Sequence, residues 1–182
     1  MSRQRSAACL AGLLCCSLLT PLQAADLVAR GASLLAPFKA ELKSALQTGL
    51  AEGPIAAVEA CRLQAPAIAV NNSSADISVG RSSHRLRNPD NAPSAWMQRV
   101  LDDYLKASAA PAPRLTHLGN GRVAYAEPIL TQGVCLVCHG ARLDPAVADI
   151  LARHYPDDAA TGFEPGELRG IFWVEFPASM ED

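Results

Sequence analysis

Two cysteines and a histidine fall within five consecutive residues, Cys135-Leu136-Val137-Cys138-His139. This spacing is the attachment signature of a c-type haem. Each thiol can add across one vinyl group of the porphyrin to form a thioether, and the two-residue gap lets both sulfurs reach one edge of the ring. His139 would then present its imidazole to the iron. We therefore predict one haem c, tethered through Cys135 and Cys138, with His139 as an iron ligand. A disulfide, a thioredoxin-like redox pair and half of a zinc site are the alternatives.

The first 24 residues have the organisation of a secretory signal peptide. Arg3 and Arg5 form a basic start, positions 7–19 form an apolar run, and Ala24 is a small residue suited to cleavage. The run is too short to span a bilayer. We expect cleavage after Ala24, export to the periplasm, and a single mature domain over residues 25–182. Covalent haem attachment in bacteria occurs outside the cytoplasmic membrane, so export and the motif agree.

Removal of the signal peptide leaves three cysteines, Cys61, Cys135 and Cys138. If two of them carry haem, Cys61 is an unpaired thiol in an oxidising compartment. A lipid anchor on Cys15 or Cys16 is a weaker alternative to cleavage, because neither cysteine follows the small residue that is usual there. The odd thiol therefore calls for a role of its own.

The mature chain is acidic. Loss of Arg3 and Arg5 reduces the basic residues from 16 to 14, against 18 acidic residues, which gives a net charge of −4. Such a charge argues against binding to nucleic acid and against electrostatic binding to anionic membranes. No later apolar run reaches 18 residues, so we expect no membrane span after cleavage.

The spacing of apolar residues predicts four helices in the mature chain. A leucine-rich stripe predicts a helix over residues 27–50, and Gly53-Pro54 ends it and opens a second helix over residues 55–69. Cys61 lies at the centre of the apolar face of this second helix. The other two helices are predicted over residues 94–106 and from Asp144-Pro145 onward.

Strands are predicted mainly in the second half of the chain. They cover residues 75–80, 114–118, 122–129 and 170–176. Gly119-Asn120-Gly121 predicts a hairpin between the second and third of them. The last strand is apolar on both faces, so we expect it to be central. Helices followed by strands with interspersed helices indicate an α+β fold with an antiparallel sheet.

A low-spin haem needs a second axial ligand, and several residues could supply it. The candidates are Cys61, His84, His117, His154, Met97 and Met180. Cys61 is unpaired and sits mid-face on a helix, where a thiol beside iron would be held as thiolate. A small buried core residue is the ordinary alternative for a free cysteine. His154 is the runner-up, and the residues alone leave the choice open.

Four stretches of the sequence carry a family resemblance. They cover residues 57–66, residues 79–93 with Trp96, residues 135–140, and residues 155–163 together with 166–170. With these motifs the chain resembles the Tll0287-like haem family, also designated DUF3365, over nearly all of residues 27–177. The resemblance implies a PAS-like α+β fold with N-terminal helices packed around one c-type haem. It also implies a cysteine from an early helix opposite the motif histidine, and that cysteine matches Cys61.

Three arginines are candidate partners for the haem propionates. Arg81, Arg85 and Arg87 lie in one basic stretch, and a guanidinium is well suited to a planar carboxylate. A solvated basic loop is the alternative reading of the same stretch.

Together these features predict a periplasmic His/Cys haem protein that senses redox state or a diatomic gas. CO or NO would bind the reduced iron once the thiolate leaves, and a redox or signalling protein would be the partner. A small electron-transfer cytochrome without a sensing role is the alternative. We expect no enzymatic activity. Peroxidase chemistry needs an open distal position with a positioned acid–base group, and a cysteine ligand on the ferric iron would block that position.

Overall fold

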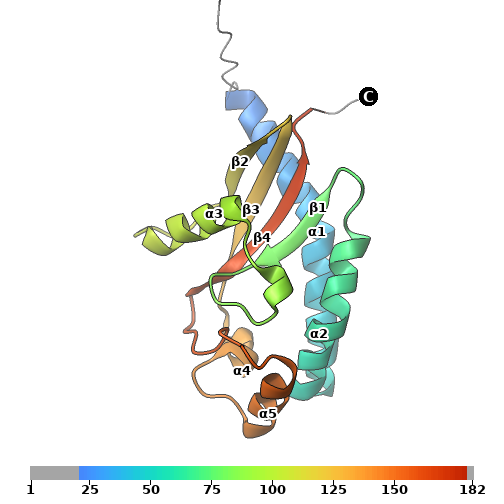
Figure 1. Ribbon diagram of the computed structural model, residues 1–182, viewed down its shortest axis with the longest axis vertical. Helices are drawn as coiled ribbons and strands as arrows, with labels where there is room; N and C mark the ends of the chain where they lie inside the picture. Colours follow the sequence, from blue (N-terminus) through green and yellow to red (C-terminus); the bar gives the residue numbers. More distant parts are fainter. Residues whose placement is uncertain (1–20, 180–182) are drawn as a thin grey trace, which may run out of the picture.

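The structure is a computed structural model that describes residues 21–179. Most of the proposed signal peptide (residues 1–20) and Met180 lie outside this range. The described part is an α+β fold with an antiparallel sheet, as the sequence predicts (Figure 1). Its α-helices are α1 (Pro21–Glu52), α2 (Pro54–Asn71), α3 (Ala95–Lys106), α4 (Leu136–His139) and α5 (Pro145–His154). Its strands are β1 (Ser78–Ser82), β2 (Arg114–Gly119), β3 (Arg122–Leu130) and β4 (Leu168–Pro177), and two short 3-10 helices are η1 (Pro89–Asn91) and η2 (Gly133–Cys135).

The strands are arranged in the order β1-β4-β3-β2, and all neighbouring pairs are antiparallel. The central place of β4 confirms the prediction from its apolar faces. Asn120 and Gly121 connect β2 to β3 with φ angles of 51° and 69°. Both central residues of a tight hairpin turn need such positive angles, which explains why Asn-Gly occurs here.

Helices cover both faces of the sheet. On one face, Phe38 of α1 packs with Tyr125 and Val174. On the other face, the α3 residues Trp96 and Leu101 belong to a cluster that includes Ala124, Ala126 and Ile171 of the sheet. Because successive strand residues point to opposite faces, β3 is buried continuously from 123 to 126.

Strand β1 begins later than the sequence predicts, at Ser78 rather than at residue 75. The preceding turn explains the difference. The Ser74 N–H donates to the Ile77 carbonyl (2.7 Å), and the hydroxyls of Ser73 and Ser74 accept from Val79 and Ile77. Serine side chains commonly replace ladder bonds in this way. At its other end the strand pairs with β4 as far as Ser82, so it contains Arg81.

The long helices α1 and α2 pack side by side, and their lower halves extend past the sheet to the region of α4 and α5 (Figure 1). A methyl group added at Gly49 of α1 would lie 2.7 Å from the Ala57 Cα of α2. The two helix backbones therefore approach closely at this point. None of the helices within residues 21–179 is long and apolar enough to cross a membrane.

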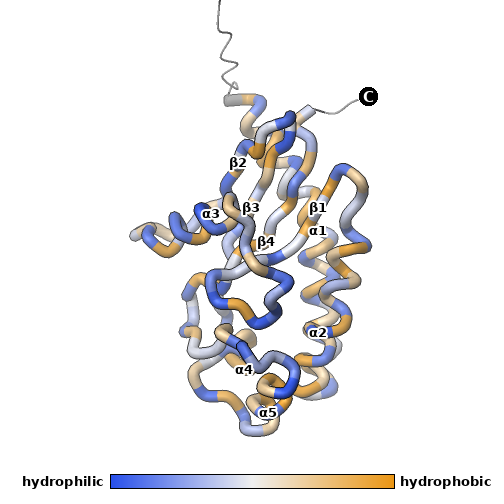
Figure 2. Tube along the Cα trace, viewed as in Figure 1, coloured by the Kyte–Doolittle hydropathy of each residue, from blue (hydrophilic) through white to orange (hydrophobic). Residues whose placement is uncertain are grey.

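A separate small core lies at this lower end. Val58 of α2 packs with Val147, Ile150 and Leu151 of α5. Cys138 lies against the same cluster. The loop between β1 and α3, which faces this region, is largely hydrophilic (Figure 2).

Candidate functional site

The cysteine–histidine motif forms one helical turn at the end of β3. Thr131 exchanges two backbone hydrogen bonds with the residues just before β4: its N–H donates to the Glu167 carbonyl, and its carbonyl accepts from the Gly166 N–H, each 2.8 Å long. The chain then turns through η2 directly into α4. Cys135 and Cys138 are both free thiols and half-buried. Residues three apart on a helical turn lie on one side of it. The Cys135 sulfur accepts a hydrogen bond from the Gln132 N–H (3.3 Å), and Cys138 packs against the cluster formed by α2 and α5.

His139 is held in one orientation and one tautomer. Its Nδ1 lies 2.6 Å from the carbonyl oxygen of Ala160, so Nδ1–H must donate and Nε2 keeps its lone pair. Burial, together with the positive charges of Arg169, Arg87 and Arg81, lowers the pKa of His139 to about 3. The ring is therefore neutral at neutral pH. A neutral imidazole whose second nitrogen is fixed by a carbonyl is the usual form of a metal ligand.

The segment 158–163 packs against the motif and forms hydrogen bonds with it. The Phe163 N–H donates to the His139 carbonyl (2.9 Å), and the Gly162 N–H donates to the Gly140 carbonyl (3.0 Å). The buried Phe163 ring meets the His139 imidazole edge to face, with centroids 6.3 Å apart. Backbone and side chain of the histidine are thus both constrained by this segment.

The structure brings Cys61 to the motif from a distant part of the sequence. Cys61 is a free, half-buried thiol on α2. Burial raises the pKa of Cys138, and the neighbouring Cys61 raises it further. Val58, one turn earlier on α2, belongs to the cluster against which Cys138 packs. The face of α2 that carries Cys61 therefore lies against α4 and α5.

The three predicted propionate partners have different surroundings. Arg87 forms an ion pair with Asp158 (2.9 Å) and donates to the Cys138 carbonyl (2.6 Å). The Arg85 guanidinium donates to the carbonyls of Ala159 and Thr161 and lies over the Phe163 ring. Arg85 and Arg87 thus hold the segment 158–163.

Arg81 differs from its two neighbours. It projects from β1, and its guanidinium has no hydrogen bond or ion pair with any part of residues 21–179. Its charge nevertheless acts on His139, so it lies near the motif.

The other axial candidates from the sequence are engaged elsewhere or lie apart. Met97 is buried in the α3 cluster, and His117 is exposed on β2. The Nε2 atom of His154 lies 2.7 Å from Glu59 Oε1. His84 packs edge to face on Phe163, with its Nδ1 buried and unpartnered. Among residues 21–179, His, Cys, Asp and Glu side chains form no group of three or more that could hold a bare metal ion.

Sequence reasoning missed Arg169. This arginine is the second residue of β4 and lies close enough to lower the pKa of His139. Its Nε is buried and has no hydrogen-bond partner in the described chain. A single arginine at the start of a strand carries no spacing signal. Only the tertiary fold shows that it reaches the motif.

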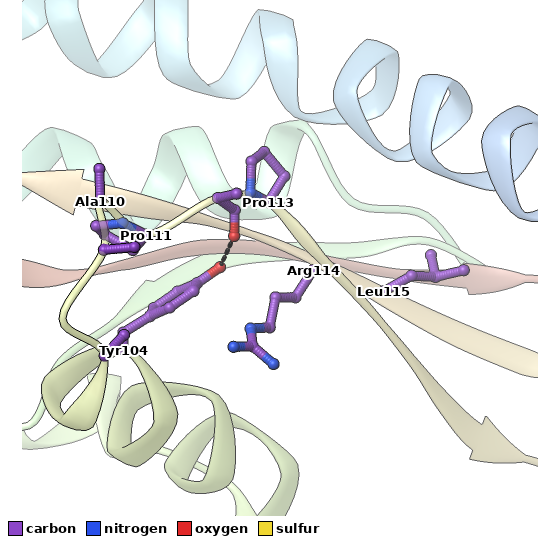
Figure 3. A pocket seen from close by; sticks show the side chains of 9 residues that line it. Tyr104, Ala110, Pro111, Pro113, Arg114 and Leu115 are labelled. Atoms are coloured by element: carbon purple, nitrogen blue, oxygen red, sulfur yellow. Dashed lines mark hydrogen bonds between the residues drawn. The ribbon is translucent and has the colours of Figure 1, made fainter.

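A shallow surface hollow of about 470 Å³ lies between the end of α3 and β2 (Figure 3). Tyr104 donates a hydrogen bond across it to the Ala112 carbonyl (2.7 Å). None of the residues that the sequence singled out for chemistry lines this hollow. It marks where an Ala/Pro-rich loop packs on Tyr104, apart from the motif.

Comparisons with known proteins place this geometry in a family. The family model "Tll0287-like: Tll0287" matches residues 25–177. No curated protein matches the chain. A solved structure described as the crystal structure of the cyanobacterial heme-protein Tll0287 is 22% identical with a TM-score of 0.59, and the match covers 90% of this chain and 100% of that chain. At this identity the structural match shows a shared fold. Together with the family model, it leads to one conclusion: the chain belongs to the Tll0287-like family.

Proposed function

We propose that this protein is a periplasmic c-type haem protein in which His139 and Cys61 are the axial ligands, and that it senses redox state or a diatomic gas. The observation that carries the proposal is the position of Cys61. A free thiol on α2 lies next to a motif turn that presents two more free thiols and a neutral histidine. The family relationship supports the same reading, because the similar solved structure is described as that of a heme-protein.

The residues around the motif fit a flat apolar ring with acidic substituents. Val134 and Val137 are 47% and 36% exposed beside the two thiols, and Leu130 is 40% exposed at the end of β3. An apolar group bound at the motif would cover the exposed side chains that flank the two thiols. On the polar side, Arg169 leaves a buried N–H without a partner. A porphyrin with carboxylate side groups would complement both features.

Each residue has a distinct role in this proposal. Cys135 and Cys138 tether the group, and the Ala160 carbonyl keeps His139 oriented with Nε2 available. Bound haem supplies an iron that takes up and returns one electron. As a thiolate, Cys61 donates negative charge and stabilises the oxidised state. Loss of the Cys61 ligand on reduction would release α2 from this restraint.

Helix packing gives a route by which such a release could act. Cys61 lies on α2, and α2 packs closely along α1 where Gly49 meets Ala57. A displacement of α2 would therefore also displace α1. We propose this helix pair as the element that carries the signal to a protein partner.

A second candidate, a small electron-transfer cytochrome, is favoured by the exposure at the motif. Val134 is half exposed and Cys135 is only half-buried, so this edge of the site is accessible to a redox partner. Electron transfer needs close approach but no change of ligand. The two candidates therefore differ in what happens at the iron on reduction.

The visible spectrum of protein made with a haem-attachment system tests the proposal in three states: oxidised, reduced, and reduced with CO. A sensor should bind CO in the reduced state, because Cys61 vacates the iron. An electron-transfer cytochrome should give the same reduced spectrum with and without CO. Peroxide turnover by the purified protein would contradict the non-enzymatic role.

Mass analysis of the same preparation tests the tether. Wild-type protein should carry one covalently bound haem, and Cys135→Ala combined with Cys138→Ala should carry none. His117→Ala, a change at an exposed position on β2, is the matched control and should load fully. An unmodified wild-type mass would contradict the proposal and revive the disulfide or thioredoxin-like alternatives.

A further inference from the structure

Arg169 is fixed in place by the ends of β1 and β4. The Ser83 hydroxyl donates to the Arg169 carbonyl (2.7 Å) and accepts from the Arg169 guanidinium (2.9 Å). The next residue, Gly170, lies so close to β1 that an added methyl group would stand 2.2 Å from the Ser82 carbonyl oxygen. The guanidinium also lies over the Phe163 ring, 5.2 Å from its centroid. These contacts hold the side chain beside the motif.

The positive charges around the motif exceed the negative charges available to them. Arg81, Arg87 and Arg169 all act on His139. Asp158 is the carboxylate that acts on Arg169 from nearby, and it is committed to Arg87. Within residues 21–179, neither Arg81 nor Arg169 has a carboxylate partner. Two guanidinium groups in a partly buried place are therefore left without counter-charges.

Such an arrangement is unfavourable unless an anion is bound. Burial, together with the positive charges of Arg81 and Arg87, lowers the pKa of Arg169 to about 10. The Nε–H of Arg169 is also buried and unpaired. A buried unpaired donor of a charged group carries a large desolvation cost. A guanidinium offers its remaining N–H groups in a plane that matches a carboxylate.

We infer that Arg169 and Arg81 bind a pair of carboxylate groups, and that these are the two propionates of the haem. This inference rests on the proposed function. It replaces Arg85 and Arg87 as propionate partners, because their guanidinium groups hold the segment 158–163. Two carboxylates match the two unpaired cations in number and in sign.

The test compares Arg169→Gln and Arg81→Gln with wild type in the haem-loaded protein. Both variants should retain the covalent haem, because the thioethers do not depend on the propionates. Loss of a nearby positive charge should favour the oxidised state at least tenfold, which is a fall of about 59 mV in the one-electron midpoint potential. Arg99→Gln, at an exposed position on α3, is the matched control and should leave the potential unchanged.

A second measurement reports on the carboxylates directly. Redox-induced infrared difference spectra of protein carrying ¹³C-labelled propionate groups should show shifted carboxylate bands in Arg169→Gln. Arg169→Lys keeps the charge but lacks the planar pair of donors, so it should shift the band and preserve most of the potential. This variant also serves if Arg169→Gln does not fold.

Two outcomes would overturn the inference while leaving the proposed function intact. In the first, the variants carry haem but match wild type in both potential and propionate bands. In the second, added phosphate or succinate shifts the wild-type potential and Arg169→Gln abolishes that response, which would show that the site takes a diffusible anion. Absence of covalent haem from the wild-type protein would instead contradict the proposed function itself.

Discussion

His139 can serve as a ligand because a carbonyl group fixes the position of its proton. The bond from Nδ1 to Ala160 leaves Nε2 as the lone-pair donor, and the burial that keeps the ring neutral comes from residues far away in the sequence. The motif spacing predicts the roles of Cys135 and Cys138 as haem tethers and of His139 as an iron ligand, because thioether formation depends on local spacing alone. It cannot predict Ala160 or Arg169, because their roles depend on which segments meet in three dimensions.

At the residue scale, we predict that Arg87→Gln strongly destabilises the protein. The side chains of Arg87 and Asp158 are only 13% and 10% exposed, so loss of the guanidinium leaves a nearly buried carboxylate unpaired. The expected loss is about 3 kcal/mol of unfolding free energy, measured by urea denaturation.

Arg114→Gln is the matched control for this prediction. The Arg114–Asp103 pair is 47% and 56% exposed, so its loss should cost less than about 1 kcal/mol. Equal losses in the two variants would show that the Arg87–Asp158 pair does not hold the segment 158–163.

At the scale of elements, the sequence predicts the helices well and the first strand poorly. Periodicity and the Gly53-Pro54 break place α1 and α2, because a repeating apolar face is needed wherever a helix packs. The late start of β1 depends instead on the hydroxyl bonds of Ser73 and Ser74. Hydrophobic alternation contains no information about such side-chain bonds.

The close approach of α1 and α2 gives a second prediction. Replacing glycine by alanine inside a helix normally stabilises it by about 1 kcal/mol. At Gly49 the sign should reverse, because the new methyl group would stand 2.7 Å from the Ala57 Cα of α2, a backbone atom. We expect Gly49→Ala to lower the unfolding free energy by about 1–3 kcal/mol.

Thr48→Ala, one residue earlier and exposed, is the control for Gly49→Ala. It should change the unfolding free energy by less than about 0.5 kcal/mol. A Gly49→Ala protein as stable as wild type, or more stable, would contradict the close packing on which the proposed signalling helix pair depends.

At the scale of the whole molecule, burial raises the pKa of all three tyrosines, Tyr104, Tyr125 and Tyr155. Tyr104 reaches about 12 from an ordinary value of 10. Between these two pH values the unfolded chain has lost a proton that folded Tyr104 keeps. The folded state therefore loses stability as pH rises through this range.

We predict that the urea midpoint of wild type is lower at pH 11 than at pH 8, with the decrease above pH 10, and that the decrease is smaller in Tyr104→Phe. The variant should also be less stable at pH 8 by about 1 kcal/mol, because the bond to the Ala112 carbonyl is lost. The measurement compares how much the urea midpoint changes with pH in wild type and in Tyr104→Phe. Equal changes in the two proteins would mean that Tyr104 is not shielded from solvent by the Ala/Pro-rich loop.

The fold class could be predicted for the whole molecule, whereas the completed site could not. Alternating and helical patterns lead to an antiparallel α+β fold because each element must bury one or both faces. The packing of the segment 158–163 between the 83–88 loop and the motif has no local signature. Its contacts, such as the bonds from Arg85 to Ala159 and from Phe163 to His139, join residues far apart in the chain.

The central claim is that Cys61 is the ligand opposite His139, and the electron paramagnetic resonance spectrum of the ferric protein tests it most directly. Wild type should give a low-spin signal typical of thiolate ligation, and Cys61→Ala should lose that signal while its covalent haem remains. Leu63→Ala, at an exposed position on the same helix, should match wild type. Coinciding ferric spectra for Cys61→Ala and wild type would contradict the account.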